Sequence, residues 1–287
     1  MYTNLQRKLR KLKKEIMDKY KLPQAYDFLE ESEALYLLLK PLSNECLSQV
    51  TQFKSWTISD VIQHLHLWNW AANESLVNES SFMKFIDTLF KDVAASGSLR
   101  QFENVWLDGL SGRSLIQEWR RFYIALATRF GECDPKRRLK WAGPDMSARS
   151  SITARLMETW AHGQEIYDHL GLVREDRDRI RNIAILGINT YKWTFLVRQE
   201  EIPGPMPLVQ LNSPSGSVWE FGEDDGSNRV IGSATEFCQV VTQVRNVGDT
   251  KLLVVGEVAN EWMSKAQCFA GAPETPPSAG TRFTRII

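Results

Sequence analysis

The sequence lacks an excess of charge of either sign, and it lacks long apolar runs. Its 35 lysine and arginine residues balance 35 aspartate and glutamate residues, which gives a formal net charge of +0 at pH 7. This balance provides no overall attraction to nucleic acid or to an acidic membrane. No apolar run reaches the roughly 20 residues that cross a bilayer, and the first residues lack the apolar stretch of a secretory signal. We therefore expect no nucleic-acid partner and no membrane span.

Cysteine and histidine are scarce, with four residues of each type. The cysteines form no Cys-x-x-Cys pair, and two of them lie in apolar helical stretches, where they are typical of small core residues. A reducing, cytoplasmic setting fits this usage best. The histidines fall in two stretches, His64 with His66 and His162 with His169. Any histidine-based metal site is restricted to these two stretches.

The 287 residues, 43% of them hydrophobic, are typical of a soluble globular protein with two domains. Apolar residues at helical spacing predict four long helices before residue 172, at 24–39, 57–77, 113–130 and 147–171. Shorter helices are expected over 81–94 and 98–110, and a fifth long one over 176–198. Four long amphipathic helices favour a helix bundle.

After Pro203-Gly204-Pro205 the pattern changes to short strands and turns. It predicts a hairpin from 208–211 and 218–221, strands at 230–231 and 251–255, and helices over 233–245 and 257–269. The expected domains are a basic helical extension (1–24), a helix bundle (25–174), a small α+β domain (175–271) and a flexible tail (272–287). The basic helix has two interpretations, a membrane-surface or nucleic-acid helix and an extension packed on the body. The rest of the chain supplies no complementary basic patch, which favours the second interpretation.

The stretch from Met157 to His169 carries the most specific chemical signal. Glu158 and His162 are four residues apart, so they lie on one face of a helix, where a carboxylate and an imidazole can reach one metal ion. A histidine from a second helix would complete a face of two histidines and one carboxylate. Such a face leaves metal positions open for water or substrate.

The same helical face also contains Arg155, Glu165 and His169, so a solvated, salt-bridged surface is the alternative interpretation. His169 lies two turns from His162, about 10 Å along the axis, and one ion cannot bind both. Glu165 could accept a hydrogen bond from the ring of His162 or His169 and fix its tautomer.

The other two histidines are separated by helical periodicity. Val61, Leu65 and Trp68 form a buried stripe on the helix over 57–77, and His64 lies at its edge. His66 is expected to point outward. His64 is therefore the candidate third ligand, and a core histidine without metal is the alternative.

Two motifs resemble a known family. The segment Trp56-Thr-Ile-Ser-Asp60-Val-Ile-Gln-His64-Leu65 is similar to the W-T-x-x-D-x-x-x-H-L segment of the DinB-like superfamily, in the branch of the mycothiol-dependent maleylpyruvate isomerases. The segments 141–149 and 153–165 closely resemble a subfamily described only as metal-binding. The resemblance implies a DinB-like four-helix bundle with metal ligands at His64, Glu158 and His162. Zinc is the default metal, and nickel, manganese and iron(II) are compatible with the ligands.

The second half, from 229–245 and 249–262, is similar to the C-terminal region of that subfamily. In the isomerases this domain resembles sterol carrier proteins. The resemblance covers nearly everything after about residue 25, and it does not explain the basic helix over 4–20.

Three functions are compatible with these residues. The first is a metal-dependent isomerase or thiol transferase that acts on a small organic acid or electrophile, with a low-molecular-weight thiol as cosubstrate. The second is a biosynthetic enzyme that uses the metal as a Lewis acid without a thiol, and the third is a non-catalytic metal- or ligand-binding protein. A homodimer is compatible with each.

Residues around the predicted ligands are candidates for substrate contact. Arg155, one turn before Glu158, could clamp a substrate carboxylate, although an ion pair with Glu158 is an equal alternative. The candidate catalytic residues are thus Arg155 and Glu165. The candidate substrate-binding residues are Trp68, Lys140, Trp141, Arg149 and Trp160.

Overall fold

A computed structural model describes residues 20–224 and 226–286 of the chain. The predicted basic helix over 4–20 lies, apart from Tyr20, outside the described residues. The described chain forms two compact units, residues 20–49 with 57–159, and residues 50–56 with 160–224 and 226–286. The domain boundaries expected from the sequence stay a prediction.

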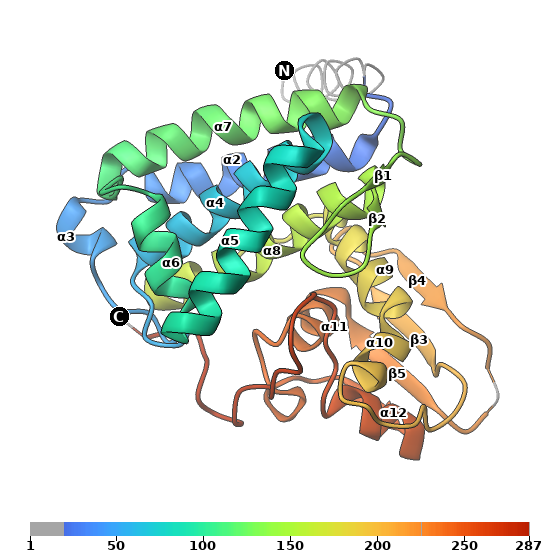
Figure 1. The fold of residues 1–287 in the computed structure, drawn as a ribbon. Helices are drawn as coiled ribbons and strands as arrows, with labels where there is room; N and C mark the ends of the chain where they lie inside the picture. The colour runs from blue at the N-terminus through green and yellow to red at the C-terminus, as the bar shows by residue number, and fades with distance from the viewer. Residues whose placement is uncertain (1–19, 225, 287) are drawn as a thin grey trace, which may run out of the picture. The chain divides into compact units, whose positions relative to one another are not determined.

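The first unit is helical, as predicted (Figure 1). Its helices are α2 (Pro23–Leu39), α3 (Asn44–Leu47), α4 (Ile58–Val77), α5 (Glu79–Ser96), α6 (Leu99–Trp106), α7 (Gly112–Glu132) and the first part of α8 (Ala148–His169). Helices α2 and α4 both pack against α7. Two-residue strands, β1 (Arg138–Leu139) and β2 (Met146–Ser147), pair antiparallel just before α8.

Local sequence signals begin and end these helices. A capping box starts α4: the Thr57 hydroxyl accepts from the Asp60 backbone amide, and the Asp60 carboxylate accepts from the Thr57 backbone amide at 2.8 Å. Pro23 occupies the first turn of α2, where its missing N–H costs nothing. Gly97 ends α5 in the left-handed conformation, with φ of 70°.

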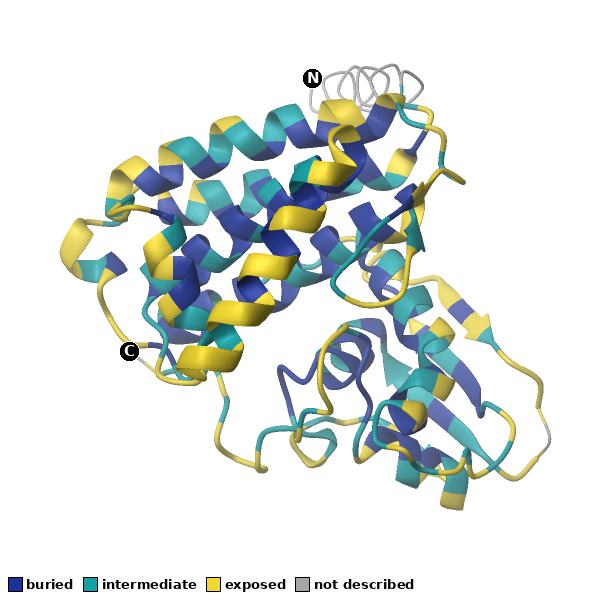
Figure 2. Cartoon of the chain, in the orientation of Figure 1, coloured by how far each residue is buried: buried dark blue, intermediate teal, exposed yellow. Residues whose placement is uncertain are grey.

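The core of the first unit combines aliphatic and aromatic side chains on the inner faces of the helices, while exposed residues follow the outer faces of α5 and α7 (Figure 2). Trp119 and Tyr123 of α7 are fully buried and pack edge to face, with ring centroids 4.7 Å apart. Burial of this kind is the main source of helix stability in a bundle.

The second unit contains the end of α8 and a small mixed sheet. Its elements are η1 (Asp178–Ile180), α9 (Arg181–Asn189), α10 (Tyr191–Leu196), β3 (Leu208–Asn212), β4 (Val218–Phe221), β5 (Arg229–Ser233), α11 (Ala234–Val241), η2 (Val247–Asp249), β6 (Leu253–Val255) and α12 (Glu257–Met263). The sheet order is β4-β3-β5-β6, with β3 and β5 parallel and the other two pairs antiparallel. A helical bundle followed by a small α+β domain is the fold class that the sequence predicts.

The predicted helix over 176–198 is wrong in one respect, because it is broken at Thr190. The Thr190 hydroxyl donates to the Leu186 carbonyl oxygen at 2.7 Å, and the backbone there leaves the helical conformation, with φ of −97° and ψ of 11°. A threonine side chain that bonds the preceding turn competes with the helical ladder. None of the helices in the described part of the chain combines the length and apolar character needed to cross a bilayer.

Candidate metal centre

Helices α4 and α8 supply the three predicted ligands. His64 comes from the middle of α4, while Glu158 and His162 lie one turn apart on α8, which is continuous from Ala148 to His169. One potential ligand atom from each of the three residues lies within 4.8 Å of the other two. Because one unbroken helix carries Glu158 and His162, their spacing is fixed by helix geometry.

The distances suit a single divalent ion after small side-chain rotations. His64 Nε2 and Glu158 Oε2 are 3.9 Å apart. Two ligands that each lie about 2.0–2.1 Å from a zinc ion are about 3–4 Å from each other. Two imidazoles and a carboxylate are also a donor set that zinc and similar ions accept. The residues present therefore fit a divalent metal ion.

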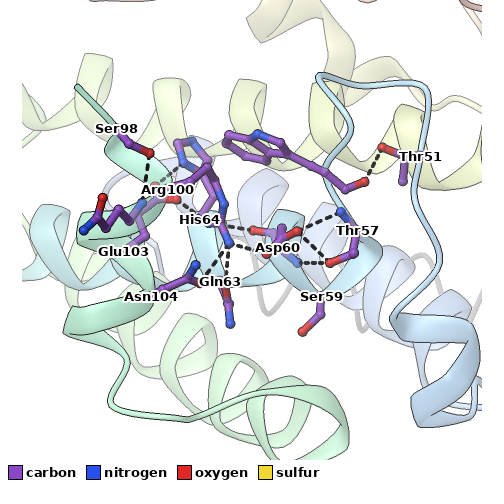
Figure 3. Close-up of polar contacts among 12 residues, drawn as sticks. Thr51, Thr57, Ser59, Asp60, Gln63, His64, Ser98, Arg100, Glu103 and Asn104 are labelled. Atoms are coloured by element: carbon purple, nitrogen blue, oxygen red, sulfur yellow. Dashed lines mark hydrogen bonds and ion pairs between the residues drawn. The ribbon is translucent and has the colours of Figure 1, made fainter. Parts of the chain in front are cut away.

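The ring of His64 is oriented by a buried carboxylate that the sequence analysis missed. His64 Nδ1 lies 2.6 Å from Glu103 Oε1, and Glu103 of α6 has no exposed surface (Figure 3). Burial alone would lower the pKa of His64, but Glu103 outweighs it and raises the pKa to about 9. The ring must give up a proton when a metal binds, so metal affinity depends on pH.

Arg100 links Glu103 to the start of α4. Its guanidinium donates to Oε2 of Glu103 and to Oδ1 of Asp60, and also to Gln63 Oε1 at 2.6 Å. The i, i+3 spacing of Arg100 and Glu103 on α6 is visible in the sequence. No sequence pattern connects α6 to α4, however, so the link to His64 could not be found there.

The ring of His162 is packed between aromatic side chains of the segment 50–56. Trp56 stacks on it with a centroid distance of 6.0 Å and an interplanar angle of 11°, and Phe53 meets it edge to face at 5.0 Å. These contacts restrict the plane of the imidazole. In the sequence, Trp56 is recognisable only as part of the W-T-x-x-D-x-x-x-H-L motif.

Arg155 is buried in the protein rather than exposed on a polar surface. It is 4% exposed, and its Nη2 lies 3.8 Å from Glu158 Oε1. Its guanidinium lies over the ring of Trp141 at 5.4 Å. In the described part of the chain, Arg155 Nε and Nη1 have no hydrogen-bond partner. Burial accordingly lowers the pKa of Arg155.

The other candidate residues of the first unit divide into two groups. Trp68 lies beside His64, with ring centroids 6.1 Å apart, and beside Trp141 at 5.6 Å. Lys140 is partly exposed and pairs with Asp145 at 2.9 Å, and Arg149 is exposed. Trp68 thus lies next to the predicted ligand His64, and Trp141 lies next to Arg155. Lys140 and Arg149 point toward solvent.

Trp160 and Glu165 belong to the second unit and have their partners within it. Trp160 is fully buried and donates to Asp176 Oδ1 at 2.8 Å. Glu165 is 2% exposed and accepts a hydrogen bond from Arg282 Nη1 at 3.1 Å. Burial outweighs Arg282 and raises the pKa of Glu165 to about 7.

This shift predicts a pH-dependent stability. A carboxyl whose pKa is raised in the folded state stabilises the fold below pH 4.5 and progressively less as the pH rises through 7. As the pH rises from 5 to 7.5, ionisation of Glu165 should lower the free energy of unfolding by roughly 2 kcal/mol. The charged groups that face Glu165 are Arg282, Asp168 and Arg245. Urea titrations of the wild type and Glu165→Gln at both pH values should show that loss only in the wild type; equal losses would contradict the assignment.

The expected outward position of His66 is wrong. His66 is 5% exposed and packs against Trp106 of α6 and Phe122 of α7, with ring centroids at 6.2 and 5.5 Å. Helices on two sides of α4 therefore bury both of its long faces. Single-helix periodicity detects one buried stripe, and it misses a second one covered by later elements.

In this chain, α4 and α8 of a helical bundle bring two histidines and a glutamate together. This arrangement is that of the DinB-like class of proteins. A family model described as the mycothiol maleylpyruvate isomerase N-terminal domain matches residues 28–167. The chain belongs to this family. Two uncharacterised proteins from two strains of Mycobacterium tuberculosis are each 36% identical over 251 residues, which cover 88% of this chain and 96% of theirs.

A solved structure supports the fold. The crystal structure of a mycothiol-dependent maleylpyruvate isomerase aligns with a TM-score of 0.52 and 16% identity, over 80% of this chain and 91% of that one. At this identity the likeness shows the fold and leaves the substrate to be argued from the site.

Proposed function

We propose that this protein is a metal-dependent enzyme of the isomerase or thiol-transferase type, acting on a small organic acid with a low-molecular-weight thiol as cosubstrate. His64, Glu158 and His162 would hold the divalent ion, with zinc as the first metal to test. The ion would polarise a substrate carbonyl or lower the pKa of a bound thiol.

The observation that carries this proposal is the buried cation of Arg155, of which Nε and Nη1 have no hydrogen-bond partner among the described residues. A buried guanidinium with two unpartnered nitrogens is costly unless an anion joins it. Its nearest carboxylate, Glu158, is a proposed metal ligand at 3.8 Å and would share its charge with the ion. The planar guanidinium fork matches a carboxylate, so an organic acid bound here would have its acid group on Arg155 and its remaining atoms toward the metal ligands.

Neighbouring side chains extend this binding surface. In the described residues, Trp68 Nε1 and Ser151 Oγ are also buried without a partner. A hydroxyl and an indole N–H can donate to substrate oxygens as Arg155 does. The rings of Trp68 and Trp141 would exclude water, which strengthens each of these hydrogen bonds.

The thiol is supported by family membership. A mycothiol-dependent isomerase shares this fold. In an isomerisation of this kind the thiolate adds to an activated double bond, the resulting single bond rotates, and expulsion of the thiolate restores the double bond. The thiol is not consumed, so catalytic amounts suffice. Testing a panel of unsaturated organic acids with the zinc-loaded protein, with and without thiol, separates this reaction from Lewis-acid chemistry without a thiol.

Replacement of Arg155 by glutamine tests the carboxylate clamp. We expect the affinity for small dicarboxylates to fall about 10- to 100-fold. This loss corresponds to the roughly 1.5–3 kcal/mol that a charge-assisted hydrogen bond contributes. The stability of the unliganded protein should not fall, because the variant removes a buried charge that lacks hydrogen-bond partners at two of its nitrogens. Calorimetric titration and urea denaturation measure the two effects. Arg149→Gln, on the exposed start of α8, is the matched control.

Loss of stability with unchanged carboxylate affinity would assign Arg155 a structural role. In that case the non-catalytic metal-binding function would become the better interpretation.

A further inference from the structure

We infer that Glu103 is a positioning residue for the metal centre, which selects the tautomer of His64 and directs its Nε2 toward the ion. This inference rests on the proposed metal centre. It concerns a residue of α6, a short helix that contributes none of the three ligands.

The hydrogen-bond geometry supports a single tautomer. Glu103 Oε1 lies 2.6 Å from His64 Nδ1, and a carboxylate can only accept. The Nδ1–H form of the neutral ring therefore donates to Glu103 and leaves the Nε2 lone pair available. The opposite tautomer would bring two acceptors together at hydrogen-bond distance. Nε2 is also the atom of His64 that lies 3.9 Å from Glu158 Oε2.

Both oxygens of Glu103 are engaged, which fixes the carboxylate itself. Oε2 accepts from Arg100, whose other terminal nitrogen donates to Asp60 and Gln63 on α4 (Figure 3). The remaining carboxylate oxygen of Asp60, Oδ2, accepts from Thr57 at the start of that helix. A series of polar contacts therefore connects the beginning of α4 to the ring of His64, two turns further along.

A purely structural role for Glu103 is the alternative. Arg100 already ties α6 to α4 through Asp60 and Gln63 without Glu103. Burying a carboxylate with no exposed surface costs free energy that this anchoring does not require. A carboxylate that receives the free N–H of a metal-bound histidine orients the ring and raises its basicity, and that role does require it.

The test is Glu103→Gln in the full chain. Glutamine keeps the shape and an acceptor oxygen but removes the charge, so zinc affinity should fall about tenfold, and Glu103→Ala should lower it up to about 100-fold. Competition with a chelator measures the affinity. The visible spectrum of the cobalt(II)-loaded protein should change, because it reports the ligand geometry directly. Glu118→Gln is the matched control, since Glu118 also pairs with an arginine three residues away on its own helix, Arg121, at 2.7 Å.

The outcomes are separable. If the wild type binds zinc and Glu103→Gln has the same zinc affinity and the same cobalt spectrum, the inference is overturned and the metal centre stands. Wild type that binds no metal would overturn the metal centre and the inference with it. If Glu103→Gln fails to fold, Glu103→Asp keeps the charge but withdraws the oxygen from His64, and an unchanged cobalt spectrum there would also overturn the inference.

Discussion

Replacing His64 by alanine is expected to strip the protein of its metal, from about one ion per chain to a small fraction of that. The site loses one of three ligands, and the ligand that is lost comes from the only contributing helix other than α8. The change also leaves Glu103 without its histidine partner. Elemental analysis after exhaustive dialysis measures the bound metal directly.

The matched control for this variant is His66→Gln. His66 lies two residues away on the same helix, is buried, and packs against Trp106 and Phe122 instead of the ligands. It should retain its metal. A His64→Ala protein with full metal content, or a His66→Gln protein without metal, would contradict the assignment of ligands to α4.

Asp168→Ala is expected to destabilise the second unit by about 3–5 kcal/mol, the usual cost of removing one partner of a buried ion pair. Asp168 has no exposed surface. Its Oδ1 accepts from Arg245 Nη2 at 2.7 Å, from Gln164 Nε2 at 3.0 Å and from Thr284 Oγ1 at 3.0 Å. Alanine would leave the buried Arg245 guanidinium without this carboxylate, and its hydrogen bond to the Val244 carbonyl oxygen does not replace the lost negative charge.

Urea denaturation followed by tryptophan fluorescence measures this loss of stability. The control is Asp224→Ala, which removes an exposed carboxylate 3.4 Å from Arg229 and should change the free energy of unfolding by less than about 1 kcal/mol. Similar effects of the two substitutions would show that burial does not control the strength of the Asp168 pair.

Local signals in the sequence were sufficient for the long helices of the first unit, while the four-residue helix α3 was not predicted. Apolar residues at helical spacing predicted a helix from residue 57, and the four-residue spacing of Glu158 and His162 predicted one ligand-bearing face. The hairpin of β3 and β4 was also predicted, because its turn residues and alternation are local. The parallel pairing of β3 with β5 was not predicted, because the segment that connects them does not specify along which edge of β3 the strand β5 lies.

The remaining contacts of the candidate site depend on pairs far apart in the chain. Glu103 is 39 residues from His64, and Arg282 is 117 residues from Glu165. The sequence instead suggested that Glu165 would bond His162 or His169, because these are its neighbours on one helix. Tertiary packing also decided the position of His66, which α6 and α7 bury on a face that looked exposed in the isolated helix.

The capping box of α4 gives Asp60 two tasks, one for each carboxylate oxygen. One oxygen begins the helix and the other holds Arg100. The orientation of His64 is therefore supported by hydrogen bonds that the polypeptide makes for itself while it folds. A centre prepared in this way does not need its ion to hold the chain together, in contrast to a zinc finger. We therefore expect the proposed centre to release and exchange an ion without unfolding, so the supply of ions in the cell would decide which metal it carries.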